Sequence, residues 1–484
     1  MFIGIDLGTS GVKLLLVTKD GEVINSISKS YDLLIPKPSW TEQNPNDWYI
    51  QTLEGLKEIV KGHEKQIQGI SFSGQMHGLV VLDENDEVLR NALLWNDQRT
   101  IKEVEYLNQE IGIDRLLELT GNIALTGLTA PKILWIKNNE PEIFEKISKM
   151  MLPKDYIAYK LTGVFASDVS DTSGTLYFDV KNKCYSQEML SILGIKEKQL
   201  PSVYESYEVI GTLKDKIQKT LGIPNPVHVI IGGGDQAVGA VGVGIVDSGS
   251  CSISLGTSGV VFVASESFKI DHKSYLQSYA HANGKYHLMG VMLNAAGALK
   301  WWSEKIFQNY NYNDFFHKLI ETPIDDSVFF LPYLTGERSP INDPLATGVF
   351  FGLRLEHRKE HMDRAVIEGV TFALKESFDL ITNLGVDIKS VRITGGGAKS
   401  DIWAQMIADI MNIDVITIEI EEGPALGAAI LAMVGAQVYA TVEDACKNII
   451  KTKALFKPNA ENADIYKIKY KKFKQIYPKI KSIF

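Results

Sequence analysis

The sequence has few cysteines, no long apolar run and no excess of basic residues. Its three cysteines, at positions 184, 251 and 446, are far apart and show no metal-ligand spacing, so neither disulfides nor structural zinc is expected. No apolar stretch approaches the roughly 20 residues that cross a membrane. The formal net charge of -9 argues against nucleic acid as the main partner, because binding a phosphate backbone needs a basic surface. We therefore expect a cytoplasmic protein that binds neither membranes nor nucleic acid.

The sequence also lacks the common nucleotide-binding motifs. The P-loop pattern G-x-x-x-x-G-K-[ST] does not occur, and no glycine cluster spells G-x-G-x-x-G. Residues Met1–Asp6 carry no basic region and begin a strand-like pattern, so a signal peptide is not expected.

Instead, the chain has the length for two domains and an alternation of strands and helices. A single core stops growing at roughly 250–300 residues, whereas the chain has 484. Strand-like segments alternate with helix-like ones in both halves, which predicts the α/β class. A break near residues 244–248 divides the chain into predicted domains 1–245 and 246–484. Aromatic side chains at helical spacing in the lysine-rich tail, residues 466–481, predict a final amphipathic helix.

One hexapeptide occurs twice, about half a chain apart. Leu7–Val12 and Leu255–Val260 both read Leu-Gly-Thr-Ser-Gly-Val. Each copy follows one apolar strand and precedes another, which indicates one strand–turn–strand unit used twice. The alternative is a generic glycine-rich hairpin that arose twice.

Both copies have the composition of a phosphate-binding turn. In the first copy, Gly8 and Gly11 allow backbone N–H groups to approach a phosphate closely. We expect the two turns to bind the phosphates of one ligand in a cleft between the two halves. The candidate donors are Thr9, Ser10 and Lys13 at the first turn and Gly256, Thr257 and Ser258 at the second.

The residue before the hexapeptide differs between the copies. Asp6 ends the first strand, and Ser254 stands at the same place in the second. An unpaired carboxylate at the end of a buried strand is costly, and a hydrated Mg²⁺ that bridges to phosphates would satisfy it. The metal role is therefore assigned to Asp6 alone. The alternative is that Asp6 is an ordinary strand-end carboxylate.

A further aspartate stands at a strand-to-helix junction. Residues 228–231 form an apolar strand, Gly232–Gly234 a turn, and Asp235 precedes a helix of small residues, 236–246. Such an aspartate can accept a hydroxyl proton during phosphoryl transfer. Aspartate is also a favoured helix N-cap, so a capping role is the alternative.

A third glycine-rich junction follows the strand at residues 391–394. Gly395, Gly396 and Gly397 present only backbone, which suits a flat adenine or ribose. Asp401 or Ser400 caps the next helix, and Asp401 is also a candidate nucleotide contact. The alternative is a plain tight turn between strand and helix.

Two polar segments, residues 73–78 and 95–99, follow strands in the first half. Amide, imidazole and carboxylate groups beside an aromatic ring suit a ligand with many hydroxyl groups, although each such residue alone is more often structural. The candidate contacts are Gln75, Met76, His77, Trp95, Asn96 and Asp97.

Together these segments resemble the FGGY family of carbohydrate kinases, within the actin, hexokinase and Hsp70-like ATPase superfamily. Residues 127–139 look like the first signature of the family, and residues 348–369 look like its second. The similarity runs over essentially the whole chain. It implies two actin-like, ribonuclease H-like domains that flank a catalytic cleft, and an ATP-dependent kinase that uses Mg²⁺.

The resemblance also implies roles for single residues. Asp235 would be the catalytic base, and Asp6 an activity-critical carboxylate near Mg²⁺. Gln236 stands where the members acting on D-xylulose often have asparagine, which is also an amide. The sugar would contact Met76 and His77, and the nucleotide would contact Gly256, Thr257, Gly297 and residues 395–397.

Within the family, the chain is most similar to members that phosphorylate D-xylulose. The segments that carry this similarity are 4–13, 74–78, 94–97, 152–156, 232–235 and 332–338. Ribulose, gluconate or a polyol is the alternative substrate, with the fold and the base unchanged. A non-enzymatic, actin-like nucleotide switch is the alternative class, which would need no base at Asp235. Homodimers are common in such kinases, but the sequence identifies no interface.

Overall fold

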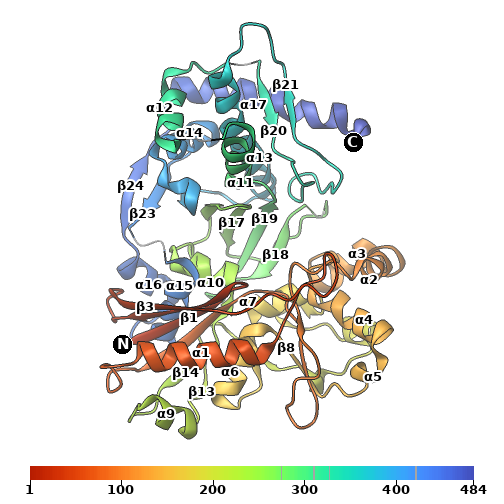
Figure 1. Ribbon diagram of the computed structural model, residues 1–484, viewed down its shortest axis with the longest axis vertical. Coiled ribbons are helices and arrows are strands. Elements are labelled where there is room, and N and C mark those ends of the chain that lie inside the picture. Colours follow the sequence, from red (N-terminus) through yellow and green to blue (C-terminus); the bar gives the residue numbers. More distant parts are fainter. Residues whose placement is uncertain (274, 309–310, 326, 420–421) are drawn as a thin grey trace.

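The computed structural model describes residues 1–273, 275–308, 311–325, 327–419 and 422–484. Two sheets, which lie in the lower and upper parts of Figure 1, organise the chain into two lobes. We call the part built on the sheet with residues 2–7 the first lobe, and the part built on the sheet with residues 250–255 the second lobe. This two-domain α/β architecture confirms the predicted fold class.

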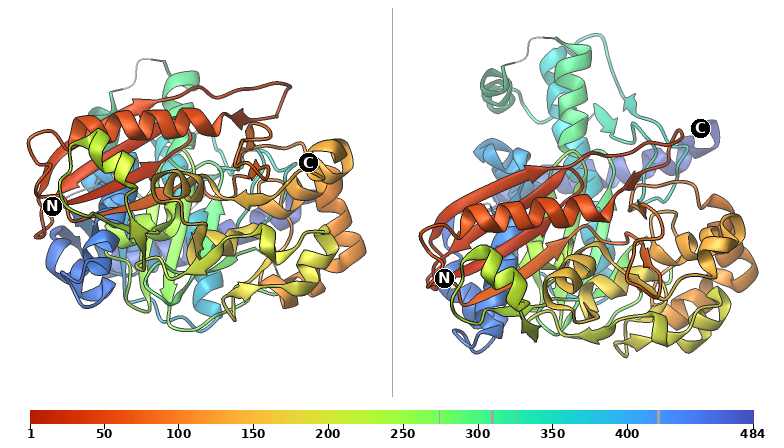
Figure 2. Two further views of the ribbon diagram at one scale, coloured as in Figure 1. Left: turned by 90° about the horizontal axis from the view of Figure 1, so that it is seen from below. Right: turned by 60° about the horizontal axis from the view of Figure 1, so that its bottom comes forward.

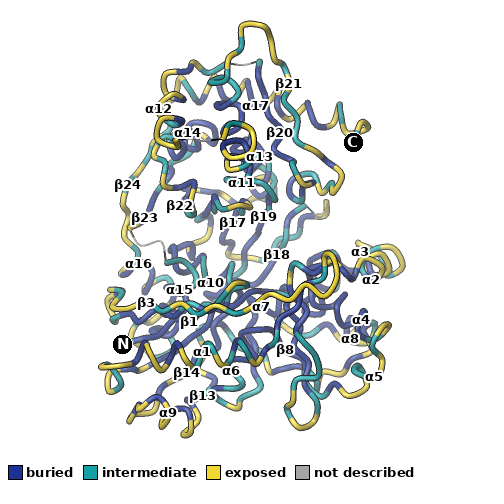
Figure 3. The backbone as a smooth tube through the Cα atoms, in the orientation of Figure 1, coloured by how far each residue is buried: buried dark blue, intermediate teal, exposed yellow. Residues whose placement is uncertain are grey.

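Within the described residues each sheet contains seven strands, and six of them follow the same order in both sheets. In the first sheet the order is β13 (Val209–Thr212), β14 (His228–Ile230), β5 (Gly69–Gly74), β1 (Phe2–Leu7), β2 (Gly11–Val17) and β3 (Val23–Ser30), with β15 (Gly233–Gly234) paired to β5. In the second sheet the order is β24 (Thr452–Phe456), β23 (Val415–Ile418), β22 (Ser390–Thr394), β16 (Ser250–Leu255), β17 (Gly259–Ser265), β19 (Tyr286–Met292) and β18 (Gln277–Ala280). Both sheets are buried along most of their length (Figure 3).

The pairing directions of the two sheets match strand by strand. β1 is antiparallel to β2 and parallel to β5, as β16 is antiparallel to β17 and parallel to β22. The next pairs outward also agree in direction on both sides. The identical hexapeptides form the equivalent turns between β1 and β2 and between β16 and β17. Because a hairpin that arose twice does not explain the shared order of six strands, we conclude that the chain contains a duplicated unit.

Alternating side chains of the first sheet build two separate cores. On one face, Ile3 packs with helix α1 (Pro45–Ile59), whose Trp48 is fully buried. On the other face, Phe2 packs with helix α15 (Gly423–Gly435). Figure 2 shows α1 in red along the outside of the first sheet.

Helix α15 follows the second sheet in the chain but packs on the first sheet. A Cβ atom at Gly4 of β1 would overlap the carbonyl oxygen of Ala425, so the two backbones touch here. Helix α10 (Asp235–Gly242) crosses α15 as closely, since a Cβ atom at Gly242 would overlap the carbonyl oxygen of Gly423. The two lobes are therefore interlocked through α10 and α15.

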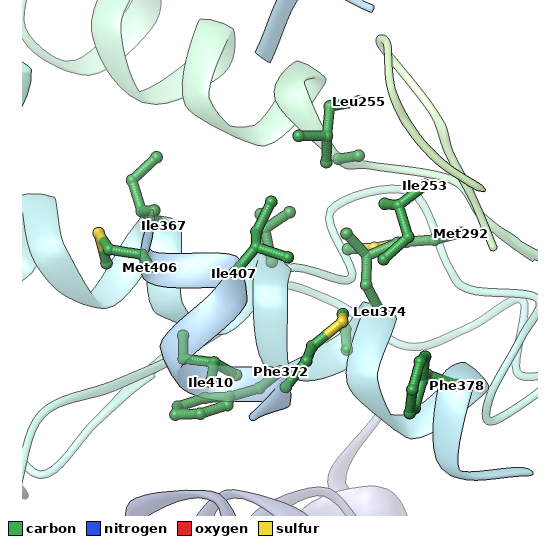
Figure 4. Close-up of a cluster of buried hydrophobic side chains, with 14 of the residues drawn as sticks. Ile253, Leu255, Met292, Ile367, Phe372, Leu374, Phe378, Met406, Ile407 and Ile410 are labelled. Carbon is green, nitrogen blue, oxygen red and sulfur yellow. The ribbon is translucent and has the colours of Figure 1, made fainter. Parts of the chain in front are cut away.

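The largest core fills the second lobe between its sheet and three helices. These helices are α13 (Lys359–Asn383), α14 (Asp401–Met411) and α17 (Ala460–Ile480). Figure 4 shows part of this core, with Ile253 and Leu255 of β16 near Leu374 of α13 and Ile407 of α14. The predicted amphipathic tail is confirmed, because α17 buries its aromatic side chains here and exposes most of its lysines.

The remaining elements surround these two layers. Those of the first lobe are β4 (Glu42–Gln43), β6 (Val80–Leu82), β7 (Ala92–Leu93), α2 (Ile101–Glu105), α3 (Ile113–Thr120), α4 (Thr129–Asn139), α5 (Pro141–Phe144), β8 (Lys149–Met151), α6 (Pro153–Thr162), β9 (Ala166–Asp168), α7 (Val169–Thr172), β10 (Phe178–Asp179), β11 (Cys184–Tyr185), α8 (Gln187–Leu193), β12 (Ser202–Tyr204) and α9 (Asp215–Leu221). The others are α11 (Ala296–Trp301), α12 (Tyr312–Glu321), β20 (Phe329–Leu331), β21 (Val349–Phe351) and α16 (Val442–Ile449). Among the described residues, no helix combines the length and the apolar character needed to cross a membrane.

Candidate active site

A pocket of about 910 Å³ opens in the second lobe where its glycine-rich turns meet. The second hexapeptide, the start of α11 and the turn after β22 form its walls. Pockets of a few hundred to a thousand Å³ hold small molecules, so the volume suits a nucleoside. Six residues predicted to hold a nucleotide line it: Gly256, Thr257, Gly297, Gly396, Gly397 and Asp401.

Close packing explains the glycines after β22. Gly395 has a φ angle of +84°, and a Cβ atom at Gly397 would lie 2.9 Å from the ring of Trp403. Helix α14 is capped by Ser400, whose hydroxyl accepts a hydrogen bond from the backbone N–H of Trp403 at 3.2 Å. Asp401, the other candidate for the cap, lines the pocket of about 910 Å³ instead.

Sequence reasoning missed the wall of this pocket that α12 supplies. Tyr312, Phe316 and Ile320 line it, and 64% of Ile320 is exposed. Apolar and aromatic side chains of this kind suit a flat nucleobase. Their spacing of four residues is the signal in the sequence, but the same spacing describes any helix that packs on a core.

Between the lobes, a second pocket of about 270 Å³ lies against Asp235. Helix α10 lines one side with Asp235 and Gln236, and the second lobe lines the other side with Ser254 and Gly395. Ser254 is the counterpart of Asp6 in the duplicated unit. The second lobe therefore presents a hydroxyl group where the first lobe presents a carboxylate.

Asp6 and Asp235 form a titratable pair at this cleft, where both are partly exposed. Burial raises the pKa of Asp6 to about 6, opposed by a hydrogen bond of 2.9 Å from the hydroxyl of Ser73 to its Oδ1 and by the charge of Lys13. Burial first, and the charge of Asp6 second, raise the pKa of Asp235 to about 7. A carboxyl group with a pKa near 7 is suited to accept a proton at neutral pH.

Asp235 is the first residue of α10 and does not cap it. Gly234 occupies the N-cap position, and no side chain caps the helix. The carboxylate of Asp235 instead interacts with the backbone and side chain of Gln236. The alternative interpretation of Asp235 as a capping residue is therefore wrong.

Thr9 connects the first hexapeptide with the predicted sugar contacts. Its hydroxyl accepts a hydrogen bond from Nε1 of Trp95 at 2.9 Å and donates one to Oε1 of Gln75 at 3.2 Å. Ser10 is exposed at the turn. Lys13 forms an ion pair with Glu422 at the start of α15. A phosphate contact of Lys13 would therefore require the ammonium group to exchange partners.

His77 and Met76 follow β5 and lie at the junction of the lobes. His77 has a φ angle of +67°, and its Nδ1 lies 2.8 Å from the carbonyl oxygen of Gly174. Burial, together with the charge of Lys132, lowers the pKa of His77 to about 3, so the ring is neutral. Because Nδ1 donates to a carbonyl oxygen, Nε2 is left as an acceptor for a ligand. Met76 packs against Tyr279 of the second lobe.

Asp97 belongs to a fully buried ion pair. Its Oδ1 accepts a hydrogen bond from Nε of Arg99 at 2.9 Å, and its Oδ2 accepts one from Nη2 at 2.8 Å and one from the backbone N–H of Thr41 at 2.7 Å. Asn96 also turns to Thr41, whose hydroxyl donates to its Oδ1 at 2.7 Å. Asp97 thus holds the loop in place, and this geometry does not support its predicted contact with a sugar. Trp95, in contrast, is 40% exposed.

Sequence reasoning also missed what the second lobe adds beside His77. The ring centroid of Tyr279, on β18, lies 6.4 Å from that of His77. The charge of Arg338 contributes to the lowered pKa of His77. Arg338 ends segment 332–338, which resembles the family but indicates no role for this arginine. No motif in the sequence surrounds Tyr279.

Comparison with known proteins agrees with this geometry. Models of the N-terminal and C-terminal domains of the FGGY family of carbohydrate kinases match residues 1–242 and 251–436. The xylulose kinase of Bacillus subtilis (strain 168) is 40% identical over 486 residues, covering 99% of this chain and 97% of the relative. The ligand-bound xylulose kinase and the gluconate kinase of Lactobacillus acidophilus are solved structures. Each matches with a TM-score of 0.95 and 30% identity, covering 99% of this chain and 98% of its own.

The duplicated sheets, the glycine-lined pocket and the carboxyl pair between the lobes fit a two-lobed sugar kinase. The chain belongs to the FGGY family of carbohydrate kinases. The predicted family and enzyme class are therefore confirmed. The predicted boundary between residues 245 and 246 falls between the two domain matches and stays a prediction, as do the roles of the single site residues.

Proposed function

We propose that this enzyme transfers the γ-phosphoryl group of ATP to D-xylulose, giving ADP and D-xylulose 5-phosphate, in pentose catabolism. The observation that carries the proposal is Asp235, a carboxyl group with a pKa of about 7 at the cleft between the lobes. The choice of sugar is supported by the relatives from Bacillus subtilis and Lactobacillus acidophilus that are named xylulose kinases.

In this reaction Asp235 would accept the proton of the C5 hydroxyl group. As the O–H bond breaks, the oxygen forms a bond to the γ-phosphorus, and the bond from that phosphorus to the bridging oxygen of ADP breaks. The pKa of about 7 places Asp235 close to the working pH, where a general base is most effective. His77 would accept a hydrogen bond from the sugar at Nε2, and Gln75, Met76, Trp95 and Gln236 would orient it.

The chemistry of Asp6 fits a Mg²⁺ ion. Its Oδ1 accepts a hydrogen bond from Ser73, and no described residue donates one to its Oδ2. The described residues contain no group of three or more His, Cys, Asp or Glu arranged to hold a metal. Mg²⁺ usually binds to one or two carboxylates and completes its shell with water and substrate phosphates. When bound, the ion would offset negative charge on the β- and γ-phosphates.

We propose that each lobe binds a different part of the substrates. Domain 1–245 would hold the sugar and one phosphate turn, with Thr9, Ser10 and Lys13. Domain 246–484 would hold the adenosine and the other phosphate turn; its contacts would be Gly256, Thr257, Ser258, Gly297, Gly395, Gly396, Gly397 and Asp401. Phosphoryl transfer depends on positioning and electrostatics, which closure of two lobes supplies while it excludes water.

A kinase assay with a panel of acceptors tests the proposal. The purified chain is incubated with Mg-ATP and D-xylulose, D-ribulose, L-ribulose, D-gluconate, xylitol or glycerol, and ADP formation is measured. We expect kcat/KM to be highest for D-xylulose. A higher value for another acceptor would refute the sugar assignment and leave the kinase class intact.

D-Gluconate is the second candidate acceptor. The gluconate kinase from Lactobacillus acidophilus matches the fold as well as the xylulose kinase from that organism does. The backbone therefore does not separate the two sugars, and the assay compares them directly. The expected cytoplasmic location and homodimer stay predictions, the second of which sedimentation velocity tests.

A further inference from the structure

Two polar groups of the second lobe lie beside the sugar-side residues without a partner. The hydroxyl group of Tyr279 is buried and forms no hydrogen bond with any described residue. The guanidinium of Arg338, on a partly exposed side chain, forms neither a hydrogen bond nor an ion pair within the described part of the chain. Because unpaired polar groups are unfavourable in a folded protein, a ligand that pairs with them would explain why the fold retains them.

The backbone around Arg338 is rigidly attached to β19. On one side, Oε1 of Glu337 accepts a hydrogen bond from the backbone N–H of Leu293 at 2.7 Å. On the other side, the backbone N–H of Ser339 donates to the carbonyl oxygen of Val291 at 3.0 Å, and the N–H of Val291 donates to Oγ of Ser339 at 3.2 Å. The guanidinium is therefore carried by a fixed backbone, as a substrate contact requires.

Electrostatic neighbours place Arg338 at the sugar end of the cleft. Its charge acts on His77 and on Tyr279. The pKa of Asp235, in contrast, responds to Asp6. The charge of Arg338 is thus felt by the predicted sugar contact His77, and Arg338 is not among the charges that shift the pKa of Asp235.

Arg338 also faces the first lobe directly. It lines a narrow pocket of about 30 Å³ together with Asn122 and Leu125 of the first lobe and Gln277 of the second. Room for about one water molecule suits a single oxygen atom of a ligand. Neither carboxylates nor other cations line this pocket in the described part of the chain, so the guanidinium is its only charged donor.

Hydrogen bonds between the lobes hold the pocket beside Arg338 in place relative to His77. Asn122 pairs its side-chain amide with the backbone of Ser278 on β18, through bonds of 2.9 Å and 3.1 Å. The hydroxyl of Ser173 accepts a hydrogen bond from the backbone N–H of Ala280 at 3.0 Å. The edge of the second sheet is thereby attached to the first lobe where Tyr279 meets His77.

We propose that Arg338 is the specificity residue that the second lobe contributes. Its guanidinium donates hydrogen bonds to the oxygen atoms at C1 and C2 of the sugar, the end remote from the transferred phosphoryl group. The side chain of Tyr279 packs with Met76, and its ring lies beside His77. This assignment rests on the proposed function, because it deepens the sugar specificity of that same site.

The test compares Arg338→Gln and Arg338→Lys with the unaltered enzyme. Calorimetric titration without ATP should show the Kd for D-xylulose rising about 10- to 100-fold in Arg338→Gln, the range for a lost hydrogen bond to a charged group. Arg338→Lys should show a smaller rise, because lysine keeps the charge but not the planar fork. The Kd for ATP should stay within about twofold.

An analogue separates direct contact from a structural effect. 1-Deoxy-D-xylulose lacks the oxygen at C1, and D-ribulose differs from D-xylulose at C3. In Arg338→Gln, the preference for D-xylulose over the deoxy analogue should shrink at least about fivefold, whereas the preference over D-ribulose should persist. A misplaced loop would reduce both preferences. Arg354→Gln, at an exposed arginine of the same lobe, is the matched control and should change neither.

Three results would overturn the assignment. In Arg338→Gln these are an unchanged Kd for D-xylulose, an equal loss of affinity for the sugar and for ATP, and an unchanged preference for D-xylulose over the deoxy analogue. The unaltered enzyme is measured first, so failure of the proposed function appears there, as phosphorylation of another acceptor. The variants are then compared on that acceptor and on its analogue without the remote oxygen, so the role of Arg338 is decided separately.

Discussion

The carboxyl groups of Asp6 and Asp235 cost the fold free energy, because the charge of one raises the pKa of the other and burial raises both. Strongly perturbed groups of this kind gather at functional sites. Asp97 differs in its surroundings, because its carboxylate is fully paired with Arg99. At the residue scale, the surroundings of each carboxylate distinguish the proposed catalytic pair, Asp6 and Asp235, from the structural carboxylate of Asp97.

Replacing Asp235 tests both its proposed role as a base and the free energy that its ionised carboxylate costs the folded protein. We expect Asp235→Asn to lower kcat by about 10²- to 10⁴-fold, the usual contribution of a general base, with the Kd for ATP unchanged. The same variant should be more stable than the unaltered enzyme at pH 8, by about 1–3 kcal/mol. A group with a raised folded pKa opposes folding once it is ionised, so the difference should shrink as the pH falls from about 7 to about 4. Near-normal turnover would refute the base assignment.

The pH profile of the sugar reaction depends on the same pair. A base must be ionised to accept a proton, so kcat/KM for the sugar should fall about tenfold per pH unit below the pKa of Asp235. That pKa is about 7 with Asp6 charged, and a cation beside Asp6 would offset this charge. Raising the Mg²⁺ concentration should therefore move the midpoint below pH 7. A profile that stays flat between pH 5 and 8 would contradict the prediction.

At the scale of helices and strands, the crossing of α10 and α15 positions Asp235. Both helices contain small residues where they meet, and α10 begins with Asp235. A Cβ atom at Gly427 would overlap the carbonyl oxygen of Val238, just as one at Gly242 would overlap that of Gly423. Backbone contact at this crossing fixes the position of α10, the helix that begins with the proposed base, Asp235.

Two glycine substitutions on α10 distinguish contact from helix propensity. Gly242→Ala should destabilise the protein by about 2–4 kcal/mol, because its Cβ atom would overlap the backbone of α15. Gly239→Ala should be neutral or slightly stabilising, since its Cβ atom would lie 3.4 Å from the ring of Pro424 and alanine favours helix. Denaturant unfolding of both variants measures the difference. Equal effects at the two positions would contradict the proposed close contact.

At the scale of the whole molecule, two kinds of contact connect the lobes. Helix α15 follows a strand of the second sheet in the chain but packs on the first sheet. Asn122 of the first lobe forms hydrogen bonds with the edge strand of the second sheet. An edge strand exposes unpaired backbone groups, and the amide of Asn122 satisfies a donor and an acceptor of Ser278. The pair of hydrogen bonds between Asn122 and Ser278 therefore attaches the two lobes at the edge of the second sheet.

Asn122→Ala should loosen this attachment. Loss of two buried hydrogen bonds leaves backbone groups of Ser278 unpaired and should lower the free energy of unfolding by about 2–4 kcal/mol. It should also increase the radius of gyration in small-angle scattering and raise the KM for the sugar. Asn108→Ala is the control, because Asn108 makes the same pair of bonds with Ala124 inside the first lobe. It should lower stability without changing the radius of gyration, and identical scattering effects would argue against the role of Asn122.

Much of the architecture could be predicted from sequence because it is encoded locally. Short apolar segments predicted the central strands, glycines predicted the turns, and the twin hexapeptides Leu7–Val12 and Leu255–Val260 predicted the duplication. The strand-to-helix junction located Asp235, and the family resemblance implied its role as the base. Local patterns could not show that α15 packs on the first sheet, because that contact joins Gly4 to Ala425 across most of the chain.

The sequence by itself determined the repeated unit, the α/β class, the candidate carboxylates and the family. The tertiary structure alone decided what identical or similar residues do. The two hexapeptides are the same, yet Leu7 pairs with Val12 while Leu255 pairs with Gly259, so the surrounding sheets set the length of each turn. Asp97 and Asp235 are both aspartates near strand ends, but Arg99 neutralises one and Asp6 repels the other. Desolvation and neighbouring charge act through space, and only the folded chain fixes those distances.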